Sequence, residues 1–352
     1  MGKFREFLKR KDIEISVQRY FVDAMGAMAQ GLFCSLLIGT IINTLGTQLG
    51  LPFLNDIGGF ASQMSGPAMA VAIGYALKCS PLVLFSLATV GYSANYYGGA
   101  GGPLAVLVVA IIASELGKAV SKETKVDILV TPLVTIFIGV ALSALIAPAI
   151  GNAAQWVGAI IMWATEQQPF IMGILVSIVV GVALTLPISS AAICASLGLV
   201  GLAGGAALAG CCANMVGFAV MSFRENRWGG LISQGLGTSM LQMGNIVRNP
   251  KIWIPAIVTS AITGPIATCV FRLQMNGPAV ASGMGTCGMV GPIGVYTGWI
   301  DDIAAGLKTS ITSLDWIGLI LIALILPAVI CWAVGILCRK IGWIKDGDLT
   351  LQ

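Results

Sequence analysis

Two short segments of the sequence carry the groups best suited to bind a polar molecule. Residues 235–239 (GLGTS) and 283–287 (GMGTC) both follow the pattern glycine, apolar residue, glycine, threonine, small residue. Glycine adopts backbone conformations that other residues avoid, so each pattern predicts a break in a helix. A broken helix leaves amide and carbonyl groups without partners, and within a membrane these groups need protein, water or a ligand. Two matched, glycine-broken apolar segments therefore indicate the binding site of a transporter.

Neutral hydrogen-bonding side chains accompany these segments. Hydroxyl and amide groups suit a polyhydroxylated or otherwise polar small solute, and the N-terminus of a broken helix can also hold an anionic group. Close helix packing through Gly and Thr is the alternative explanation of the pattern. The candidate solute-binding residues are Gln234, Thr238, Ser239, Gln242, Asn245 and Thr286 in the two segments, together with Asn43 and Asn276.

The sequence contains no histidine, which removes the commonest proton shuttle and metal ligand. Motifs of nucleotide-binding loops, zinc proteases and serine hydrolases do not occur either. A self-contained catalytic centre is therefore not expected, and any enzymatic role would be that of a membrane component in a larger system. The nine cysteines are scattered through apolar stretches and are interpreted as small buried hydrophobes. We expect no metal site, no cofactor and no binding to nucleic acid.

The composition indicates a helical membrane protein. Hydrophobic residues make up 57% of the 352 residues, charged residues make up 10%, and the mean hydropathy is +0.92. A soluble domain has about 25% charged residues. Long apolar runs recur along the chain, as they do in polytopic α-helical membrane proteins. We predict an all-α fold with about ten transmembrane helices in the lipid bilayer, plus two re-entrant hairpins.

The predicted crossings follow the apolar runs of the sequence. The two broken segments are expected to be re-entrant hairpins, the one over about 228–247 entering and leaving from the cytoplasmic face and the one over about 275–298 from the outer face. The other crossings are expected at about 21–48, 57–77, 80–97, 103–119, 128–149, 169–187, two short crossings within 190–222, 252–271 and 314–338.

Basic residues set the expected orientation. Residues 3–20 place Phe4, Phe7 and Leu8 on one helix face among basic residues, a pattern typical of an interfacial helix. The positive-inside rule puts both this end and the basic stretch 339–345 in the cytoplasm. We expect an interfacial amphipathic helix over 1–20, a single transmembrane transporter domain over 21–340 and a cytoplasmic tail over 341–352.

The chain resembles the membrane (IIC) component of the bacterial sugar phosphotransferase system, and it is most similar to the stand-alone branch that includes proteins of the perfringolysin-regulator type. The resemblance covers nearly the full length. It rests on the basic N-terminal helix running into residues 25–33 (MGAMAQGLF), on residues 234–245 and on residues 282–293.

The resemblance implies a homodimeric, multi-pass carrier in the bacterial cytoplasmic (inner) membrane, with about ten helices. One part of each protomer would form the dimer scaffold, and a mobile part would hold the substrate beside two hairpins. Such carriers pass a sugar to a cytoplasmic IIB domain, which phosphorylates it. A chain of this length leaves no room for IIA or IIB domains, so these partners are expected either to be separate proteins or to be absent.

Three functions remain open from the sequence. The leading hypothesis is a transporter of a small polar solute, such as a sugar, that works by alternating access around a broken-helix site. The alternative is a membrane solute sensor or regulator built on a transporter fold. A channel is a third possibility, because Gly and Thr backbone also builds selectivity filters. A channel would need a symmetric pore motif, and we find none in the sequence.

Overall fold

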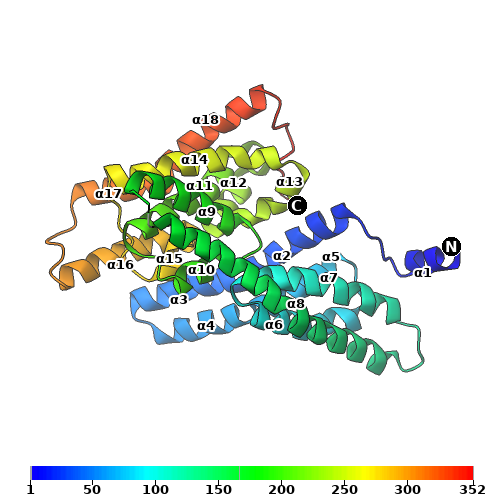
Figure 1. The fold of residues 1–352 in the computed structure, drawn as a ribbon. Helices are drawn as coiled ribbons and strands as arrows, with labels where there is room; N and C mark the ends of the chain where they lie inside the picture. The colour runs from blue at the N-terminus through cyan, green and yellow to red at the C-terminus, as the bar shows by residue number, and fades with distance from the viewer. Residues whose placement is uncertain (1, 166, 352) are drawn as a thin grey trace. The chain divides into compact units, whose positions relative to one another are not determined.

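The computed structural model describes residues 2–165 and 167–351, and the side chains of residues 2–4 and 196 lie outside what it describes. The proposed face of the N-terminal helix is therefore described for Phe7 and Leu8 but not for Phe4. Every named element is helical (Figure 1). The chain forms two compact units, Met1–Ala153 and Ala154–Gln352. The single transporter domain over 21–340 stays a prediction.

The first unit begins with a short helix and then a long one. Helix α1 ends at Arg10, so the predicted helix over 3–20 covers two elements separated by a loop. The long helix runs without interruption from Gln18 to Leu49. The elements are α1 (Gly2–Arg10), η1 (Gln18–Asp23), α2 (Ala24–Leu32), η2 (Phe33–Leu37), α3 (Ile38–Leu49), α4 (Pro52–Gln63), α5 (Ser65–Ala76), α6 (Pro81–Gly98), η3 (Gly99–Gly101) and α7 (Gly102–Val120).

Ion pairs and hydrogen bonds connect the loop after α1 to the rest of the first unit. Arg19 contacts the carboxylate of Asp12 at 2.6 Å, and the Nζ atom of Lys118 donates to the backbone oxygen of Asp12 at 2.8 Å. The hydrogen bond from Arg19 holds the pKa of Asp12 below its usual value. Glu123 accepts from Lys11, which likewise lowers the pKa of Glu123.

Helix α8 (Asp127–Thr165) carries the chain from the first unit to the second. Its 39 residues correspond to a length of about 58 Å at 1.5 Å per residue, well beyond the apolar thickness of a bilayer, about 30 Å. The sequence predicts a crossing over 128–149 followed by a weaker stretch, and the structure joins both into one helix.

The second unit holds the remaining elements. They are α9 (Pro169–Thr185), α10 (Ser190–Ser196), α11 (Gly201–Met221), α12 (Phe223–Ile232), η4 (Ser233–Gly237), η5 (Ser239–Gln242), α13 (Met243–Arg248), η6 (Pro250–Trp253), α14 (Ile254–Pro265), η7 (Ile266–Val270), α15 (Ala279–Ser282), η8 (Cys287–Met289), α16 (Val290–Ala304), α17 (Ser313–Ile320), η9 (Leu321–Ile325) and α18 (Leu326–Lys340).

Helices α9, α11 and α14 pack side by side at the centre of the second unit (Figure 1). Glycines bring their backbones into direct contact. A Cβ atom on Gly210 would lie 1.8 Å from the carbonyl oxygen of Ser177, and one on Gly264 would lie 2.1 Å from that of Gly173. Nearly all of α11 is buried, so this glycine-rich helix is the core around which the broken segments are arranged.

Among the described residues, six helical stretches are long and apolar enough to cross a membrane, and Pro169–Thr185 is a shorter apolar helix. The ten predicted crossings are not confirmed by this count. One stretch, Pro81–Val120, contains α6 and α7, which pack against each other across the turn at Gly99. The run 190–222, predicted to hold two crossings, contains one long helix, α11, because α10 has only seven residues.

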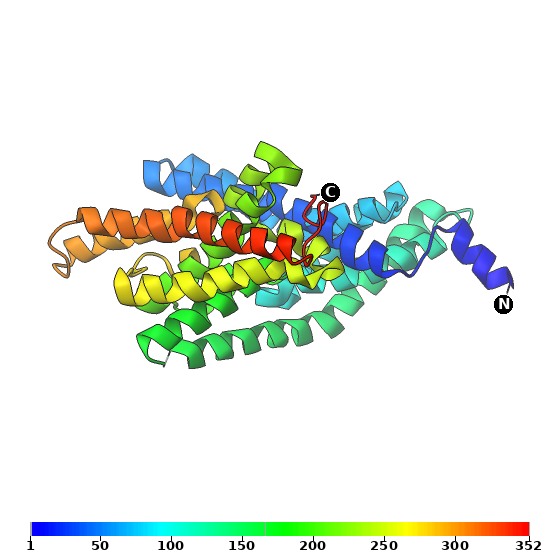
Figure 2. The ribbon, with the colours of Figure 1, turned by 90° about the horizontal axis from the view of Figure 1, so that it is seen from above.

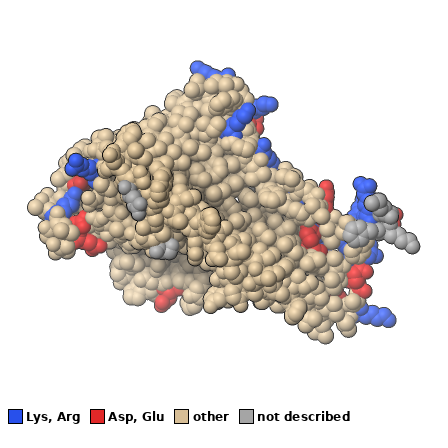
Figure 3. Space-filling view, viewed as in Figure 1, with Lys and Arg blue, Asp and Glu red and all other residues tan. Residues whose placement is uncertain are grey.

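Two antiparallel stretches define the ends of the second unit. Ser313–Lys340 appears as a continuous rod in Figure 2. Lys251, at the start of Pro250–Val270, lies 5.9 Å from the ring of Trp343 just beyond that rod. At the other end, the ring of Phe271 lies against Gly318. On the face shown in Figure 3, most of the surface is uncharged, as expected for helices that face lipid.

Candidate functional site

The two glycine-rich segments meet in the second unit. The hydroxyl of Thr286 donates to the carbonyl oxygen of Gly235 at 2.5 Å, and Thr286 is fully buried. Its Oγ1 atom also lies 3.8 Å from the Sδ atom of Met215 on α11. The matched threonine motif of the second segment is therefore hydrogen-bonded to the matched motif of the first, against the central helix.

The first segment is not a continuous helix. A π-helical turn ends at Gly237, Thr238 is extended (φ −157°, ψ 141°), and a 3₁₀ turn follows. The Thr238 hydroxyl accepts from the backbone N–H of Met240 at 3.1 Å and so caps the new turn. The break that the glycines predict lies at Thr238 itself.

The second segment is broken by left-handed residues. Gly285 (φ +55°), Gly288 (φ +51°) and Met289 (φ +59°) separate the short α15 from α16. A Cβ atom on Gly285 would lie 2.7 Å from that of Cys211 on α11, so both the conformation and the close contact require glycine. The Ser190 hydroxyl anchors this segment to α10 by donating to the carbonyl of Gly283 at 2.8 Å.

A cluster of buried hydroxyl and amide groups connects Ser239 to the central helices. The hydroxyls of Ser239 and Thr185 lie 2.7 Å apart, and Thr185 donates to the side-chain oxygen of Asn214 at 3.2 Å. The indole Nε1 of Trp253 donates to the same oxygen at 2.9 Å. The Asn214 amide lies 3.4 Å from the hydroxyl of Ser260. All but Trp253 are buried.

A row of amide side chains extends from the first segment. Gln234 donates to the hydroxyl of Ser222 at 2.8 Å, Gln242 donates to Gln234 at 2.9 Å, and Asn245 donates to Gln242 at 2.8 Å. We call Gln234, Gln242 and Asn245 the amide row. All three are buried, so each needs partners for its polar atoms.

The C-terminal segment completes the hydrogen bonding of the amide row. The Leu349 carbonyl accepts from Gln242 at 2.9 Å and from Asn226 at 2.8 Å. The Thr350 carbonyl accepts from Asn245 at 2.9 Å. The predicted tail over 341–352 is therefore seated, within its described part, on the polar side chains of the first broken segment.

A comparison of the whole sequence with known families identifies its relatives. The profile described as "Phosphotransferase system, EIIC" matches residues 22–351. The chain belongs to this family. Curated proteins gave no match, and neither did solved structures. Family membership makes this EIIC protein a multi-pass membrane component of sugar transport, with a sugar as substrate and cytoplasmic IIA and IIB proteins as partners.

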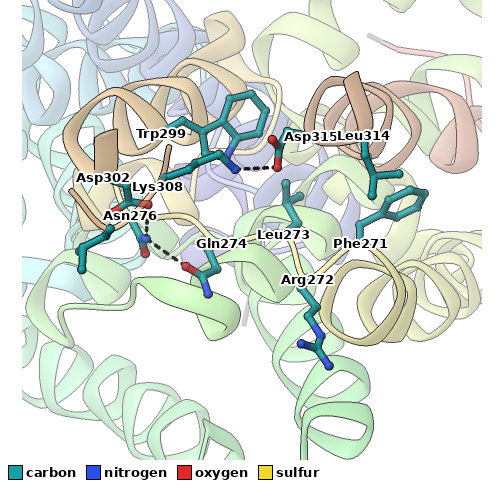
Figure 4. A pocket seen from close by; sticks show the side chains of 12 residues that line it. Phe271, Arg272, Leu273, Gln274, Asn276, Trp299, Asp302, Lys308, Leu314 and Asp315 are labelled. Carbon is teal, nitrogen blue, oxygen red and sulfur yellow. Dashed lines mark hydrogen bonds and ion pairs between the residues drawn. The ribbon is translucent and has the colours of Figure 1, made fainter. Parts of the chain in front are cut away.

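In this EIIC protein Asn276 lies apart from the amide row. It lines a cavity of about 490 Å³ beside η7, α16 and α17, at the end of the second unit opposite Lys251 and Lys340. Asn276 donates to Asp302 at 2.8 Å and to Gln274 at 3.1 Å. Figure 4 shows these side chains together, with Asp302 and Asn276 facing one another.

The other half of this cavity is aromatic and charged. Lys308 contacts Asp315 at 2.8 Å and lies 5.6 Å from the ring centroid of Trp299, which is buried. Figure 4 shows Arg272 directed away from these groups. Carboxylate, amide and indole groups around a cavity of this size form a site suited to a polar small molecule.

Asn43 is located in the first unit, on α3, and its side chain is exposed. Its assignment as a binding residue stays a prediction. The six candidates of the two segments, by contrast, are all buried in the second unit.

Sequence reasoning missed several polar residues that join this site. Thr185, Ser260 and Trp253 carry no local signal, because Ser and Thr are common on apolar helices, where they bond to the preceding turn. Asn226 and the carbonyls of the tail are brought in by the fold alone. Within the described part of the chain, no group of three or more His, Cys, Asp or Glu residues could hold a metal ion.

Proposed function

We propose that this EIIC protein carries a small polar solute, a sugar, across the bacterial cytoplasmic membrane by alternating access, and that it binds the solute where the two broken segments meet. The hydrogen bond between Thr286 and Gly235 carries the proposal, because it joins two matched motifs through residues that lie 51 positions apart in the sequence. Buried breaks in helices of this kind are where transporters bind their substrates.

The chemistry of the site suits an uncharged sugar. In the present arrangement the hydroxyls of Thr185 and Ser239 bond to each other. The side chains of the amide row bond separately among themselves. A sugar hydroxyl both donates and accepts, so it can replace these internal bonds with little net change in free energy. Neither motif contains a Lys or Arg that could pair with an anionic group.

The charges of the second unit support an orientation. Arg248, Lys251, Arg339, Lys340 and Lys345 gather at the end where α18 stops, which the positive-inside rule assigns to the cytoplasm. The cavity beside Asn276 then faces the outside. We propose that this cavity, with Asp302 and Trp299, is the outer entrance for the solute.

Other features of the proposal come from the sequence. The homodimer and the perfringolysin-regulator-like branch follow from the family resemblance, the re-entrant nature of the two broken segments follows from their glycine-broken apolar sequences, and the cytoplasmic location of both termini follows from the positive-inside rule. Transfer of phosphate to the arriving sugar would take place on separate IIA and IIB proteins.

Counterflow in proteoliposomes tests the proposed function. Vesicles preloaded with glucose, mannitol or N-acetylglucosamine are diluted into trace radiolabelled solute, and the protein is expected to accumulate label for at least one of them. Ser239→Ala is expected to reduce this exchange, because it removes a buried hydroxyl that is 2.7 Å from Thr185. Saturable binding without exchange would overturn the carrier and favour the alternative, a solute sensor. If the protein neither binds nor exchanges any member of a panel of sugars and polyols, both the carrier and the sensor are refuted.

A further inference from the structure

The C-terminal segment is held mainly through its peptide backbone, to which nearby side-chain amides are hydrogen-bonded. The side chain of Asn226 donates to the carbonyl of Leu349 at 2.8 Å and accepts from the N–H of Leu351 at 2.8 Å. Gln242 and Asn245 each donate to a carbonyl of the same segment. An amide side chain that pairs with both a carbonyl and an N–H of the main chain can recognise a peptide backbone, because it both donates and accepts.

The segment is also held by a buried side chain and by its own turns. Leu349 is fully buried and Ile344 is nearly so. Gly342 (φ +81°) and Gly347 (φ +95°) turn the chain back after α18. Asn249 then donates to the Trp343 carbonyl at 2.9 Å and to the Asp348 carboxylate at 2.8 Å. The last residues are therefore docked at both ends of the turn.

The donors that the tail occupies have no spare hydrogens. Each side-chain amide has two N–H groups. Gln242 gives one to Gln234 and one to Leu349, and Asn245 gives one to Gln242 and one to Thr350. Departure of the tail would leave a buried N–H on each residue in need of an acceptor, such as water or a solute hydroxyl.

We propose that Asn226, Gln242 and Asn245 form a peptide-binding surface whose ligand is the C-terminal segment of the same chain, residues 348–351. We further propose that the docked segment locks the first broken segment, so that the segment must leave before the solute site opens on this side. The docking stands on the contacts themselves, whereas the locking rests on the proposed function.

Two variants separate docking through the side chain from docking through the backbone. Leu349→Asp places a charge where Leu349 is fully buried, and it should release the tail without touching the amide row. Thr350→Ala is the matched control, because Thr350 contacts Asn245 through its carbonyl oxygen and its side chain is exposed. A chain truncated after Lys340 removes the whole docked segment without placing a charged side chain at position 349.

Hydrogen–deuterium exchange of the full-length protein tests the docking. Leu349→Asp and the truncated chain are expected to speed exchange in residues 239–248 by about tenfold, since local opening sets the rate, while Thr350→Ala leaves it unchanged. A synthetic peptide of residues 341–351, added to the truncated chain, should restore slow exchange. Unaltered exchange in both tail variants, or no effect of the peptide, would overturn the docking.

Counterflow with the solute that the wild-type protein exchanges tests the lock. Leu349→Asp and the truncated chain should exchange solute severalfold faster, and the peptide should slow the truncated chain again. Suppose that all variants exchange solute at equal rates, while deuterium exchange still shows that the tail docks. This result would overturn the lock and leave the carrier standing. No counterflow by the wild-type protein would refute the carrier, and with it the lock, while the docking would still be decided by deuterium exchange.

Discussion

The hydroxyl of Thr286 donates to the carbonyl oxygen of Gly235 at 2.5 Å, and so one threonine joins the two glycine-rich motifs of the chain. The carbonyl belongs to a π-helical turn, and the threonine precedes a 3₁₀ turn. The side chain of one broken segment therefore bonds to the backbone of the other, and the bond depends on the hydroxyl at position 286.

Thr286→Val should destabilise the protein by about 1–3 kcal/mol, because it removes the hydroxyl that donates to the partly buried carbonyl oxygen of Gly235 and leaves a methyl group beside that oxygen. Thr286→Ser keeps the hydroxyl and should lose much less. Thermal unfolding of the two detergent-solubilised variants measures the difference. Equal midpoints for Val and Ser would show that the hydrogen bond does not hold the segments together.

Gly285→Ala should be more harmful than an ordinary glycine substitution. Gly285 has a φ of +55° and no room for a Cβ atom beside Cys211, so a loss of about 1–3 kcal/mol is expected. Gly59→Ala on α4 is the control, because Gly59 has open space around it and alanine is favoured in a helix interior. Thermal unfolding that ranks Gly59→Ala as the worse variant would contradict the proposed close contact.

Asp302→Ala should weaken binding of the transported solute from outside by about tenfold or more, since a hydrogen bond to a charged group contributes roughly 1.5–3 kcal/mol. Asp301→Ala is the control, because Asp301 is adjacent, exposed and carries the same charge but does not line the cavity. The half-saturating external concentration in counterflow measures the effect. If the two variants behave alike, the cavity is not the entrance.

Acid should loosen the attachment of the N-terminal loop. The hydrogen bond from Arg19 holds the pKa of Asp12 below its ordinary value of 3.8. The stabilisation is therefore fully present above that value and is lost as the pH falls through the lower pKa of the folded protein. Wild-type unfolding temperature should fall in this acid range more steeply than that of Asp12→Asn. Parallel curves for the two proteins would mean that Asp12 does not contribute.

Local signals in the sequence predicted some helices closely. The predicted ranges 80–97 and 103–119 agree with α6 and α7, because a proline near each start and the glycines between them mark the ends. The predicted range 57–77 is instead divided between α4 and α5 at Met64. Gly66 and Pro67 in the first turn of α5 do mark this boundary, but the apolar residues on both sides carried the predicted range across it.

The candidate site was predictable only where it lies within a repeated motif. Six residues of the two segments were found because the glycine–threonine pattern occurs twice, and all six are buried in one unit. Thr185 and Trp253 reach the site from ordinary apolar helices. The tail contributes the backbone carbonyls of Leu349 and Thr350. Every residue has such a carbonyl, so the residue types do not show which of them take part.

The bare backbone contacts between α9, α11 and α14 limit how the second unit can move. Where a Cβ atom on Gly210 would lie 1.8 Å from the Ser177 carbonyl, sliding α11 by one residue would drive the side chain of a neighbour into a peptide group. Shear along these helices would therefore be costly, and in the proposed alternating access the three helices would move as one rigid body. The broken segments, whose helical geometry is already interrupted, would be suitable pivots for such a motion.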